Sequence, residues 1–387
     1  MILGTVKETF PGESRVGLVP RVLPSLTKAG LEVLIESGAG LAAGFTDDAY
    51  SDKGARICNR AEVFGSADLV IQVRGLGANP EYGRSDLELM RRGQILIATF
   101  EPLTAAEEIR QIAAKQVSLL ALEMIPRITR AQSMDVLSSM ATVAAYKAVL
   151  LGAQTLVKMF PMMMTAAGTI TPARVLIIGV GVAGLQAIAT SKRLGAKVQA
   201  YDVRPAVREE VESLGAKFVE MELEAGDAQD AGGYAKDMGD EFLRKQRELM
   251  TRVVAESDVV ITTAAVPGKK APLLVTADMV RGMSPGSVIV DMAAERGGNC
   301  ELTKAGETVV EGGVTILGPT NIAATVPYHA SQMFSKNATT LALHITKDGK
   351  FRLDTDDEIV RETLVTHEGA IPHPRIREAF GLAEATT

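Results

Sequence analysis

The chain has 387 residues and a net charge of −6, with 47% hydrophobic and 23% charged residues. It is too long for one ordinary domain, and this balance is typical of a soluble globular protein, not of a disordered or fibrous one. The acidic balance, without a stripe of Lys and Arg, argues against nucleic acid as a partner. Cys58 and Cys300 lie far apart and outside any C-x-x-C pattern, so neither a disulfide framework nor a zinc site is expected.

The N-terminal part predicts a strand, a helix and a second strand. Ile2 to Val6 is short and apolar, Pro20 to Ala29 has a proline near its first helical turn, and Val33 to Ile35 follows as the next strand. The chain does not begin with the pattern of a signal peptide, and its longest uncharged run, Val175 to Ser191, is explained as a strand and a helix. We therefore expect a cytoplasmic protein without a membrane span.

Two stretches of the first third recur later in the same order. Ala67 to Ile71 matches Ser257 to Ile261, and Met90 to Ile97 matches Met283 to Val290. The recurrence predicts an α/β fold with two Rossmann-like, doubly wound parallel-sheet domains. We expect a cleft to separate these domains and a long helix to join them.

The segment between the two predicted domains has a helical pattern. Gln132 to about Met159 contains no proline, and Ser133 or Asp135 could cap its start. It is the expected joining helix. The following cluster, Phe160 to Met164, is interpreted as soft side chains that fill an irregular core, with a ligand surface as the less favoured alternative.

A second return of the chain is predicted near Gly318 to Tyr328. This segment separates a strand, Val314 to Leu317, from a helical run, Ser331 to His344. The last residues would then rejoin the first domain and make it discontinuous. The expected domains are residues 1–133 with 328–387, and residues 134–327 with the joining helix.

A glycine-rich loop follows the strand expected at Val175 to Ile178. Gly179, Gly181 and Gly184 have the spacing G-x-G-x-x-G at the start of a helix. In that pattern the first glycine makes a tight turn, the second lets the backbone approach a pyrophosphate, and the third lets helix and strand pack closely. The phosphates would lie on the free N–H groups of the helix from about Ala183 to Leu194.

Asp202 ends the next predicted strand, Lys197 to Tyr201. A carboxylate there can accept hydrogen bonds from the adenosine ribose hydroxyls and would repel a 2′-phosphate, so the pattern predicts NAD and not NADP. Arg204 either lies along the adenine or pyrophosphate or is an ordinary surface arginine. In the alternative interpretation the glycines form a turn without a ligand and Asp202 caps a helix.

Four motifs resemble the NAD(H)-binding subunit of proton-translocating nicotinamide nucleotide transhydrogenase, a relative of the alanine dehydrogenases. They are Arg127 to Asp135, Phe160 to Gly168, Gly179 to Gln186 and Ala231 to Lys236. The resemblance implies a soluble, dimeric component that binds NAD(H) and exchanges hydride directly with NADP(H) held by a partner subunit. Membrane-spanning partners would couple this reaction to proton translocation and attach the chain peripherally to the inner face of the cell membrane.

The resemblance also implies individual roles. Arg127, Asp135 and Ser138 would hold the nicotinamide end, and Gln132 would reach toward the second nucleotide. Val182, Asp202 and Arg204 would hold the adenosine and pyrophosphate, and Gly233 and Tyr234 would lie on a mobile loop that closes over the cofactor. For Arg127, Gln132 and Asp135 the alternative is helix capping and surface pairing. The implied binding residues are Arg127, Gln132, Ser133, Met134, Asp135, Ser138, Gly179, Gly181, Val182, Gly184, Asp202, Val203, Arg204, Gly233 and Tyr234.

The main alternative is an amino-acid dehydrogenase that resembles alanine dehydrogenase. Such an enzyme moves a proton as well as a hydride, so it needs a general acid or base. Glu101 and Glu295 stand where that family places a histidine and an aspartate, although Arg15 matches its substrate-carboxylate arginine. Hydride transfer between two nicotinamides needs only their alignment, which favours transhydrogenation. A NAD-binding regulatory protein without chemistry is the third interpretation.

Overall fold

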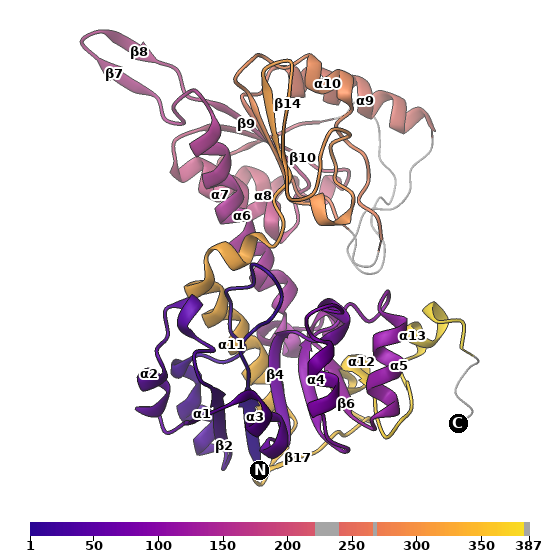
Figure 1. Ribbon diagram of the computed structural model, residues 1–387. Coiled ribbons are helices and arrows are strands. Elements are labelled where there is room, and N and C mark those ends of the chain that lie inside the picture. Colours follow the sequence, from indigo (N-terminus) through magenta and orange to yellow (C-terminus); the bar gives the residue numbers. More distant parts are fainter. Residues whose placement is uncertain (221–239, 266–268, 383–387) are drawn as a thin grey trace. The chain divides into compact units, whose positions relative to one another are not determined.

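The computed structural model describes residues 1–220, 240–265 and 269–382, which form two compact units (Figure 1). Unit 1 consists of Met1–Met140 with Ala323–Thr387, and unit 2 is Ala141–Ile322. Each unit is built on a seven-stranded sheet in which most neighbouring strands are parallel. The predicted fold class, with two doubly wound domains of which the first is discontinuous, is confirmed.

The sheet of unit 1 has the strand order β18-β6-β5-β4-β1-β2-β3. Six strands are parallel, and the C-terminal strand β18 adds to β6 in the antiparallel direction. The chain reverses its direction of winding between β1 and β4, which is the switch point of a doubly wound sheet. The strands are β1 Ile2–Thr5, β2 Glu32–Glu36, β3 Arg56–Cys58, β4 Leu69–Arg74, β5 Ile95–Thr99, β6 Ser118–Ala121 and β18 Leu364–Thr366.

Helices cover both faces of this sheet because its strands are apolar on both sides. In β4, Leu69 and Ile71 pack with α1 and α11, whereas Val70 packs with α3 and α5. This alternation follows from the two-residue period of a strand. The helices of unit 1 are α1 Leu23–Lys28, α2 Asp47–Ser51, α3 Arg60–Ser66, α4 Arg84–Leu89, α5 Ala106–Ala114, α11 Pro327–His344, α12 Glu358–Thr363 and α13 Pro374–Ala379, with a small hairpin of β16 Thr346–Lys347 and β17 Lys350–Phe351.

Unit 2 repeats this arrangement with the order β11-β10-β9-β12-β13-β15-β14. Its switch point lies between β9 and β12, and the edge strand β14 is antiparallel to β15. The strands are β9 Arg174–Ile178, β10 Lys197–Tyr201, β11 Lys217–Phe218, β12 Val259–Thr262, β13 Val288–Asp291, β14 Thr308–Glu311 and β15 Val314–Leu317.

The sheet of unit 2 is also covered on both faces (Figure 1). In β9, Val175 and Ile177 pack toward α6 (Val136–Thr155), α7 (Val182–Arg193) and α8 (Arg208–Ser213), whereas Leu176 and Ile178 pack toward α9 (Asp240–Ala255) and α10 (Ala277–Arg281). The carboxyl ends of these buried strands therefore form a fixed edge on which a ligand site can be built. The helices are α7 Val182–Arg193, α8 Arg208–Ser213, α9 Asp240–Ala255 and α10 Ala277–Arg281.

Helix α6, Val136–Thr155, begins in unit 1 and continues into unit 2. The prediction that it starts at Gln132 is wrong, because a 3-10 helix, Thr129–Met134, precedes it and Asp135 is extended. Its mean hydropathy of 1.5 and its 20 residues make it long and apolar enough to cross a membrane. The helix is not one of the long uncharged runs in the sequence, because it contains Lys147. The same test is passed by core helices of soluble proteins, so it is weak support for a span.

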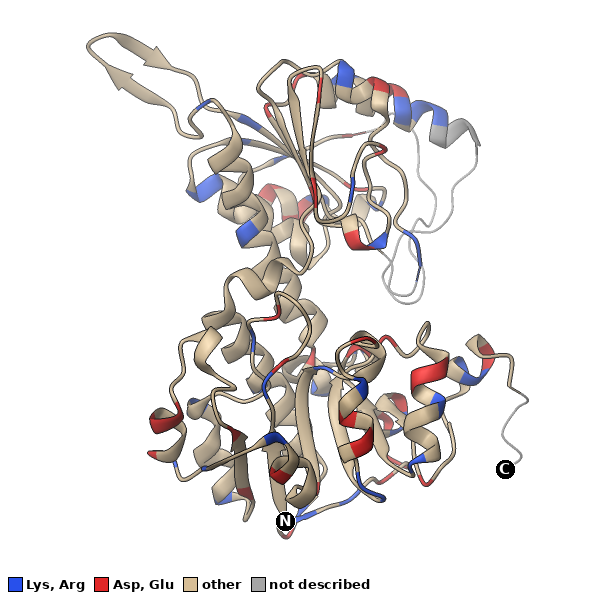
Figure 2. Cartoon of the chain, in the orientation of Figure 1, with Lys and Arg blue, Asp and Glu red and all other residues tan. Residues whose placement is uncertain are grey.

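A two-stranded hairpin of β7, Met163–Thr165, and β8, Gly168–Ile170, extends away from the sheet of unit 2 (Figure 1). Met162 and Met164 are 58% and 78% exposed, so the interpretation of this methionine cluster as core filling is wrong. Only Phe160, at the base of the hairpin, belongs to the core. Figure 2 shows that the hairpin carries no charged residue, whereas acidic and basic residues are interspersed on the helices of both units.

Candidate nucleotide-binding site

The glycine-rich loop joins β9 to α7 at the switch point of unit 2, and its three glycines have three different surroundings. Gly179 has φ 93°, and a Cβ there would lie 2.7 Å from Oγ1 of Thr263. A Cβ on Gly184 would lie 1.9 Å from the carbonyl oxygen of Gly179, so only glycine lets the helix pack this closely. A Cβ on Gly181 would meet nothing within 4 Å. The loop is tightly packed at its two ends and open in the middle.

The first turn of α7 provides hydrogen-bond donors at this opening. Gly181 is the N-cap residue and provides no side chain, and the N–H of Leu185 bonds to its carbonyl oxygen. The N–H groups of Val182, Ala183 and Gly184 precede that bond and have no partner within the helix. Such a helix end favours an anion through its N–H groups and its dipole. Val182, 45% exposed, lies at this opening.

Asp202 follows β10 and bonds directly to the glycine loop. Its Oδ2 accepts from the N–H of Val180 at 2.7 Å, and its Oδ1 accepts from the N–H of Arg204 at 2.9 Å. The Arg204 guanidinium donates to both oxygens, each at 2.9 Å. These hydrogen bonds raise the pKa of Arg204. Arg204 is thus the ion-pair partner of Asp202 and not an ordinary surface arginine.

Four donors therefore surround a carboxylate that has about four lone-pair positions. A ribose hydroxyl can bond to Asp202 only if one of these donors withdraws. Two donors are backbone N–H groups fixed by the strand ends, so the Arg204 side chain, which is 16% exposed and also donates to the carbonyl oxygen of Val180, is the donor that would have to rotate outward. Val203, half-buried between the two residues, packs against the core of unit 2.

The predicted residues of unit 1 lie around the 3-10 helix Thr129–Met134. Asp135 caps α6: its Oδ1 accepts from the N–H of Ser138 at 2.9 Å and its Oδ2 from the Ser138 hydroxyl at 2.6 Å. The sequence allowed Ser133 or Asp135 as the cap of this helix, and these hydrogen bonds show that Asp135 is the cap. Met134 is buried in the core, and the carbonyl oxygen of Ser133 accepts from Nδ2 of Asn337.

The side chains of Arg127, Gln132 and Ser133 are exposed, as a surface site for a ligand requires. Gln132 thereby differs from Met134, two residues later on the same 3-10 helix, whose side chain is part of the core. Gly233 and Tyr234, predicted on a closing loop, lie outside the described residues.

A buried cluster of charged residues occupies the switch point of unit 1. Glu8 accepts from the N–H groups of Val73 and Arg74 at the end of β4, at 2.7 and 3.1 Å. Burial and the neighbouring Glu13 raise the pKa of Glu8 to about 8. Burial alone would also raise the pKa of Glu13, but its paired hydrogen bonds from Arg15 lower it to about 2. Arg15 is thus an ion-pair partner of Glu13 in this structure.

Glu101 and Glu295, which we expected at the positions of the alanine dehydrogenase histidine and aspartate, each form a hydrogen bond that involves a backbone N–H group. Glu101 has φ 50° and its N–H donates to Oε1 of Glu123 at 2.7 Å. Burial raises the pKa of Glu123 to about 7. Glu295 is exposed and accepts from the N–H of Asn321. All four histidines lie between positions 329 and 373, so they are far in the sequence from the loops that follow β4 and β5.

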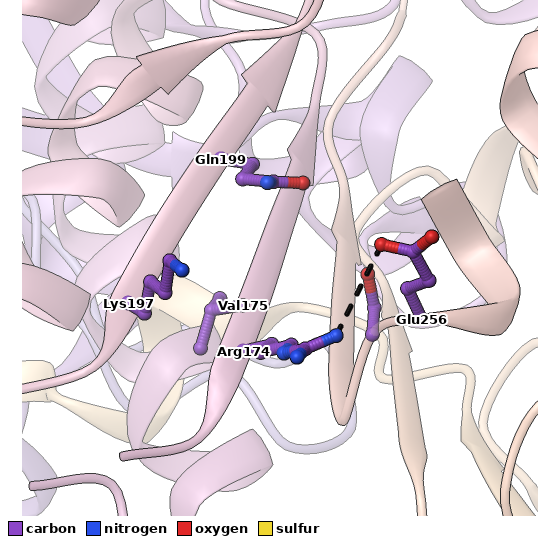
Figure 3. A pocket seen from close by; sticks show the side chains of 6 residues that line it. Arg174, Val175, Lys197, Gln199 and Glu256 are labelled. Carbon is purple, nitrogen blue, oxygen red and sulfur yellow. Dashed lines mark ion pairs between the residues drawn. The ribbon is translucent and has the colours of Figure 1, made fainter. Parts of the chain in front are cut away.

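A shallow hollow at the opposite edge of the unit 2 sheet is a different feature (Figure 3). Arg174, Lys197 and Gln199 line it near the amino ends of β9 and β10, and Arg174 lies 4.0 Å from Glu256. The glycine loop lies at the carboxyl ends of these strands, so the hollow is not part of the candidate nucleotide site.

Sequence reasoning missed the loop that follows β12. Thr263 donates its hydroxyl to the carbonyl oxygen of Gly179 at 2.9 Å, and Ala264 is held by Asn299. The sequence contains part of the signal, because Ser257 to Ile261 recurs as the counterpart of Ala67 to Ile71, and in a doubly wound sheet the residues that follow such a segment can lie beside the glycine loop.

Comparison with known proteins agrees with this geometry. Residues 4–144 match the alanine dehydrogenase/PNT N-terminal domain, and residues 148–374 match the corresponding C-terminal domain. The chain belongs to the alanine dehydrogenase/PNT family. Within this family it is 47% identical, over 97% of its length and 99% of the relative, to the first part of NAD(P) transhydrogenase subunit alpha of Rhodospirillum rubrum.

Two further members of the family differ in their similarity to this chain. The crystal structure of transhydrogenase from Sinorhizobium meliloti superimposes with a TM-score of 0.87 at 42% identity, covering 96% of this chain and 100% of that one. Alanine dehydrogenase of Bacillus subtilis is 29% identical over 98% of this chain and 95% of its own. The resemblance to transhydrogenase alpha subunits is thereby confirmed, and alanine dehydrogenase is a more distant relative.

Proposed function

We propose that this chain is the NAD(H)-binding component of a proton-translocating transhydrogenase. It would exchange hydride directly between NAD(H) and NADP(H), the second nucleotide being held on a partner subunit. The observation that carries the proposal is the open glycine loop bonded to Asp202, in a chain 47% identical to a transhydrogenase alpha subunit. We also infer a homodimer, attached to the inner face of the cell membrane through membrane-spanning partners that move the protons.

The described residues fit an NAD(H) molecule in two respects. Gly181 leaves room beside the N–H groups of α7 for a pyrophosphate, and Asp202 would provide an acceptor for an adenosine ribose once the Arg204 side chain moves aside. A 2′-phosphate would bring a second anion against this carboxylate, so NAD(H) is favoured over NADP(H). The bound nucleotide supplies the hydride at its nicotinamide, and the reaction needs alignment but no proton transfer by the protein.

The roles that we assign to unit 1 concern this alignment. Arg127, Asp135 and Ser138 would hold the nicotinamide end, with backbone contributions from Ser133 and Met134, and Gln132 would reach toward the NADP(H) on the partner. The exposure of Gln132 and Arg127 supports such roles. Asp135 and Ser138 are bonded to each other, which would give the carboxylate a fixed orientation.

The decisive experiment uses the purified chain with and without an NADP-binding transhydrogenase component. The chain alone is expected to bind NADH in calorimetry but to reduce nothing. With the component present, deuterium at the reactive carbon of NADH should appear in NADPH without exchange with water. Deuterium that is lost to solvent, or NADH oxidation by the chain alone, would contradict direct transfer to a partner.

Gln132→Ala separates hydride transfer from binding. Transfer should slow by about tenfold or more, equivalent to roughly 1.4 kcal/mol per tenfold, while NADH affinity changes little because Asp202 and the glycine loop are intact. The control is Gln154→Ala, which removes another exposed glutamine, on α6. Equal losses of binding and transfer in Gln132→Ala would make Gln132 an ordinary cofactor ligand.

The dehydrogenase alternative has its own assay. Because Glu101 stands in place of the histidine, the chain should not oxidise NADH in the presence of pyruvate and ammonia. Turnover of about one per second, a modest rate for an enzyme, would favour the alternative.

A further inference from the structure

The loop after β12 forms one wall of the glycine loop, on the side of β9 opposite to Asp202. The N–H of Thr263 donates to the carbonyl oxygen of Ile178 at 2.8 Å, and its hydroxyl donates to that of Gly179 at 2.9 Å. Since Gly179 has a positive φ and no room for a side chain, its position depends on this neighbouring loop. A displacement of Thr263 would therefore change the shape of the glycine loop.

A single buried side chain fixes this loop from behind. Asn299 is 0% exposed, and its Oδ1 accepts from the N–H of Ala264 at 3.1 Å. Its Nδ2 donates to the carbonyl oxygens of Ala264 and Pro272, each at 2.8 Å. Because one amide group binds both the N–H and the C=O of Ala264, it determines the orientation of the backbone next to Thr263.

Asn299 is itself fixed by a buried carboxylate at the end of β13. Oδ2 of Asp291 accepts from the N–H groups of Asn299 and Cys300, at 2.8 and 3.0 Å, and from the Thr303 hydroxyl. Its Oδ1 accepts from the Thr262 hydroxyl at 2.9 Å. A Cβ on Gly298 would lie 2.8 Å from Oδ2 of Asp291, so a glycine is required where the chain turns around this carboxylate.

We propose that Asn299 is a positioning residue for the nicotinamide half of the bound dinucleotide. The strand order places Asp202 on the β10 side of the glycine loop and Ala264 on its β12 side. In this topology a dinucleotide lies across the switch point, with its adenosine over the strand that carries the acidic residue. The loop held by Asn299 then supports the other half. The inference rests on the proposed binding of NAD(H).

The test compares two ligands on the full chain: NADH, which extends over both sides, and AMP, which reaches only the adenosine side. Asn299→Ala should weaken NADH binding in calorimetry by about tenfold or more and leave AMP binding within about twofold. Asp202→Asn should weaken both ligands by similar factors. The matched control is Asn79→Ala, which removes a buried asparagine of unit 1 and should change neither affinity.

A merely structural role of Asn299 would give a different pattern, with equal losses of NADH and AMP binding or with both affinities unchanged. Either result, in a variant that remains folded, would overturn the inference alone. If Asn299→Ala does not fold, Thr263→Val, which removes the hydroxyl contacts with Ile178 and Gly179, should still show the selective loss of NADH binding, and an equal loss would overturn the inference. An unmodified chain that does not bind NADH would overturn the proposed function and this inference with it.

Discussion

In unit 2 the chain leaves β9 through Gly179 and enters α7 at Val182, so the end of a helix lies directly at the switch point. In unit 1 the chain leaves β1 at Thr5 and forms its first helical turn only at Pro20. The intervening segment brings Glu8 to the end of β4, where it accepts two backbone N–H groups. The order of the five strands around the switch point is the same in both units, yet one switch point is open and the other is filled by the protein itself.

This difference shows that a doubly wound topology alone does not leave a switch point open. A switch point that could take a phosphate also requires a glycine with open space around it, such as Gly181, and a helix that starts at once. In unit 1 the glycines near the switch point are packed: a Cβ on Gly17 would lie 2.9 Å from the carbonyl oxygen of Ile71, and one on Gly75 would meet the Phe100 ring at 2.0 Å. The switch point of unit 1 is therefore filled by side chains and backbone of the same unit.

The largest effect is expected from Gly184→Ala. Its Cβ would overlap the carbonyl oxygen of Gly179, so the strand and the helix must separate, which should destabilise the protein by about 2 to 4 kcal/mol and abolish NADH binding. Denaturant unfolding and calorimetry measure the two effects. The control is Gly65→Ala on α3 of unit 1, where a Cβ meets nothing within 4 Å and stability should not fall. Wild-type stability of Gly184→Ala would show that the close packing is not required.

A smaller effect is expected from Asp202→Asn. The loss of the carboxylate should weaken NADH binding by about 1.5 to 3 kcal/mol, about tenfold to a hundredfold, and should reduce the discrimination against NADPH. Calorimetry with both nucleotides measures the change. Equal affinity of the unmodified chain for NADH and NADPH would make the assignment of Asp202 to nucleotide selection untenable.

Gly181→Ala should weaken binding without affecting the fold. The added methyl group enters open space and the backbone has a negative φ, so the free energy of unfolding should change by less than about 0.5 kcal/mol. The same methyl group would obstruct the approach of a pyrophosphate, and NADH affinity should fall by about tenfold. Unchanged affinity would mean that the phosphates do not lie against this part of the loop.

Glu8→Gln tests the filled switch point through the pH dependence of stability. The pKa of Glu8 is about 8 in the folded protein and lower when the chain unfolds, so the stability it contributes is present at low pH and is lost as the pH rises toward 8. The unmodified protein should therefore lose up to about 1.4 kcal/mol per pH unit from this group between pH 5 and 8, and the variant should lack this slope. Urea unfolding measures it. Glu32→Gln, an exposed glutamate on β2, should keep the slope, and its loss in this control would refute the assignment.

The elements around the glycine loop could be predicted from the sequence because they depend on neighbouring residues. The strand expected at Lys197 to Tyr201 has those bounds in the structure, and β9 differs from its prediction by one residue. A run of buried branched residues that ends in glycine contains this information locally. The start of α6 was wrong by four residues, since the side-chain contacts of Asp135 with Ser138 decide it.

Other features depend on contacts between distant parts of the chain and could not be predicted. The two hydrogen bonds between Asn299 and Ala264 join residues 35 positions apart. A single asparagine after two glycines is not part of a sequence pattern that would predict such contacts. The exposure of Met162 and Met164 is likewise a property of the folded hairpin, because the same side chains in another arrangement would fill a core.

The ion pair between Asp202 and Arg204 has a consequence for repeated turnover. If a ribose hydroxyl displaced the Arg204 side chain and then departed with the nucleotide, Asp202, which is 7% exposed, would keep only its two backbone N–H donors and would lack a compensating charge. The Arg204 guanidinium can take up that position again, so the charge of Asp202 is compensated before binding and after release. Exchange of one set of donors for another would limit the difference in free energy between the two states. Under the proposed function, a chain that loads and releases NAD(H) in every cycle would benefit, because neither the free nor the bound state would become a deep free-energy minimum.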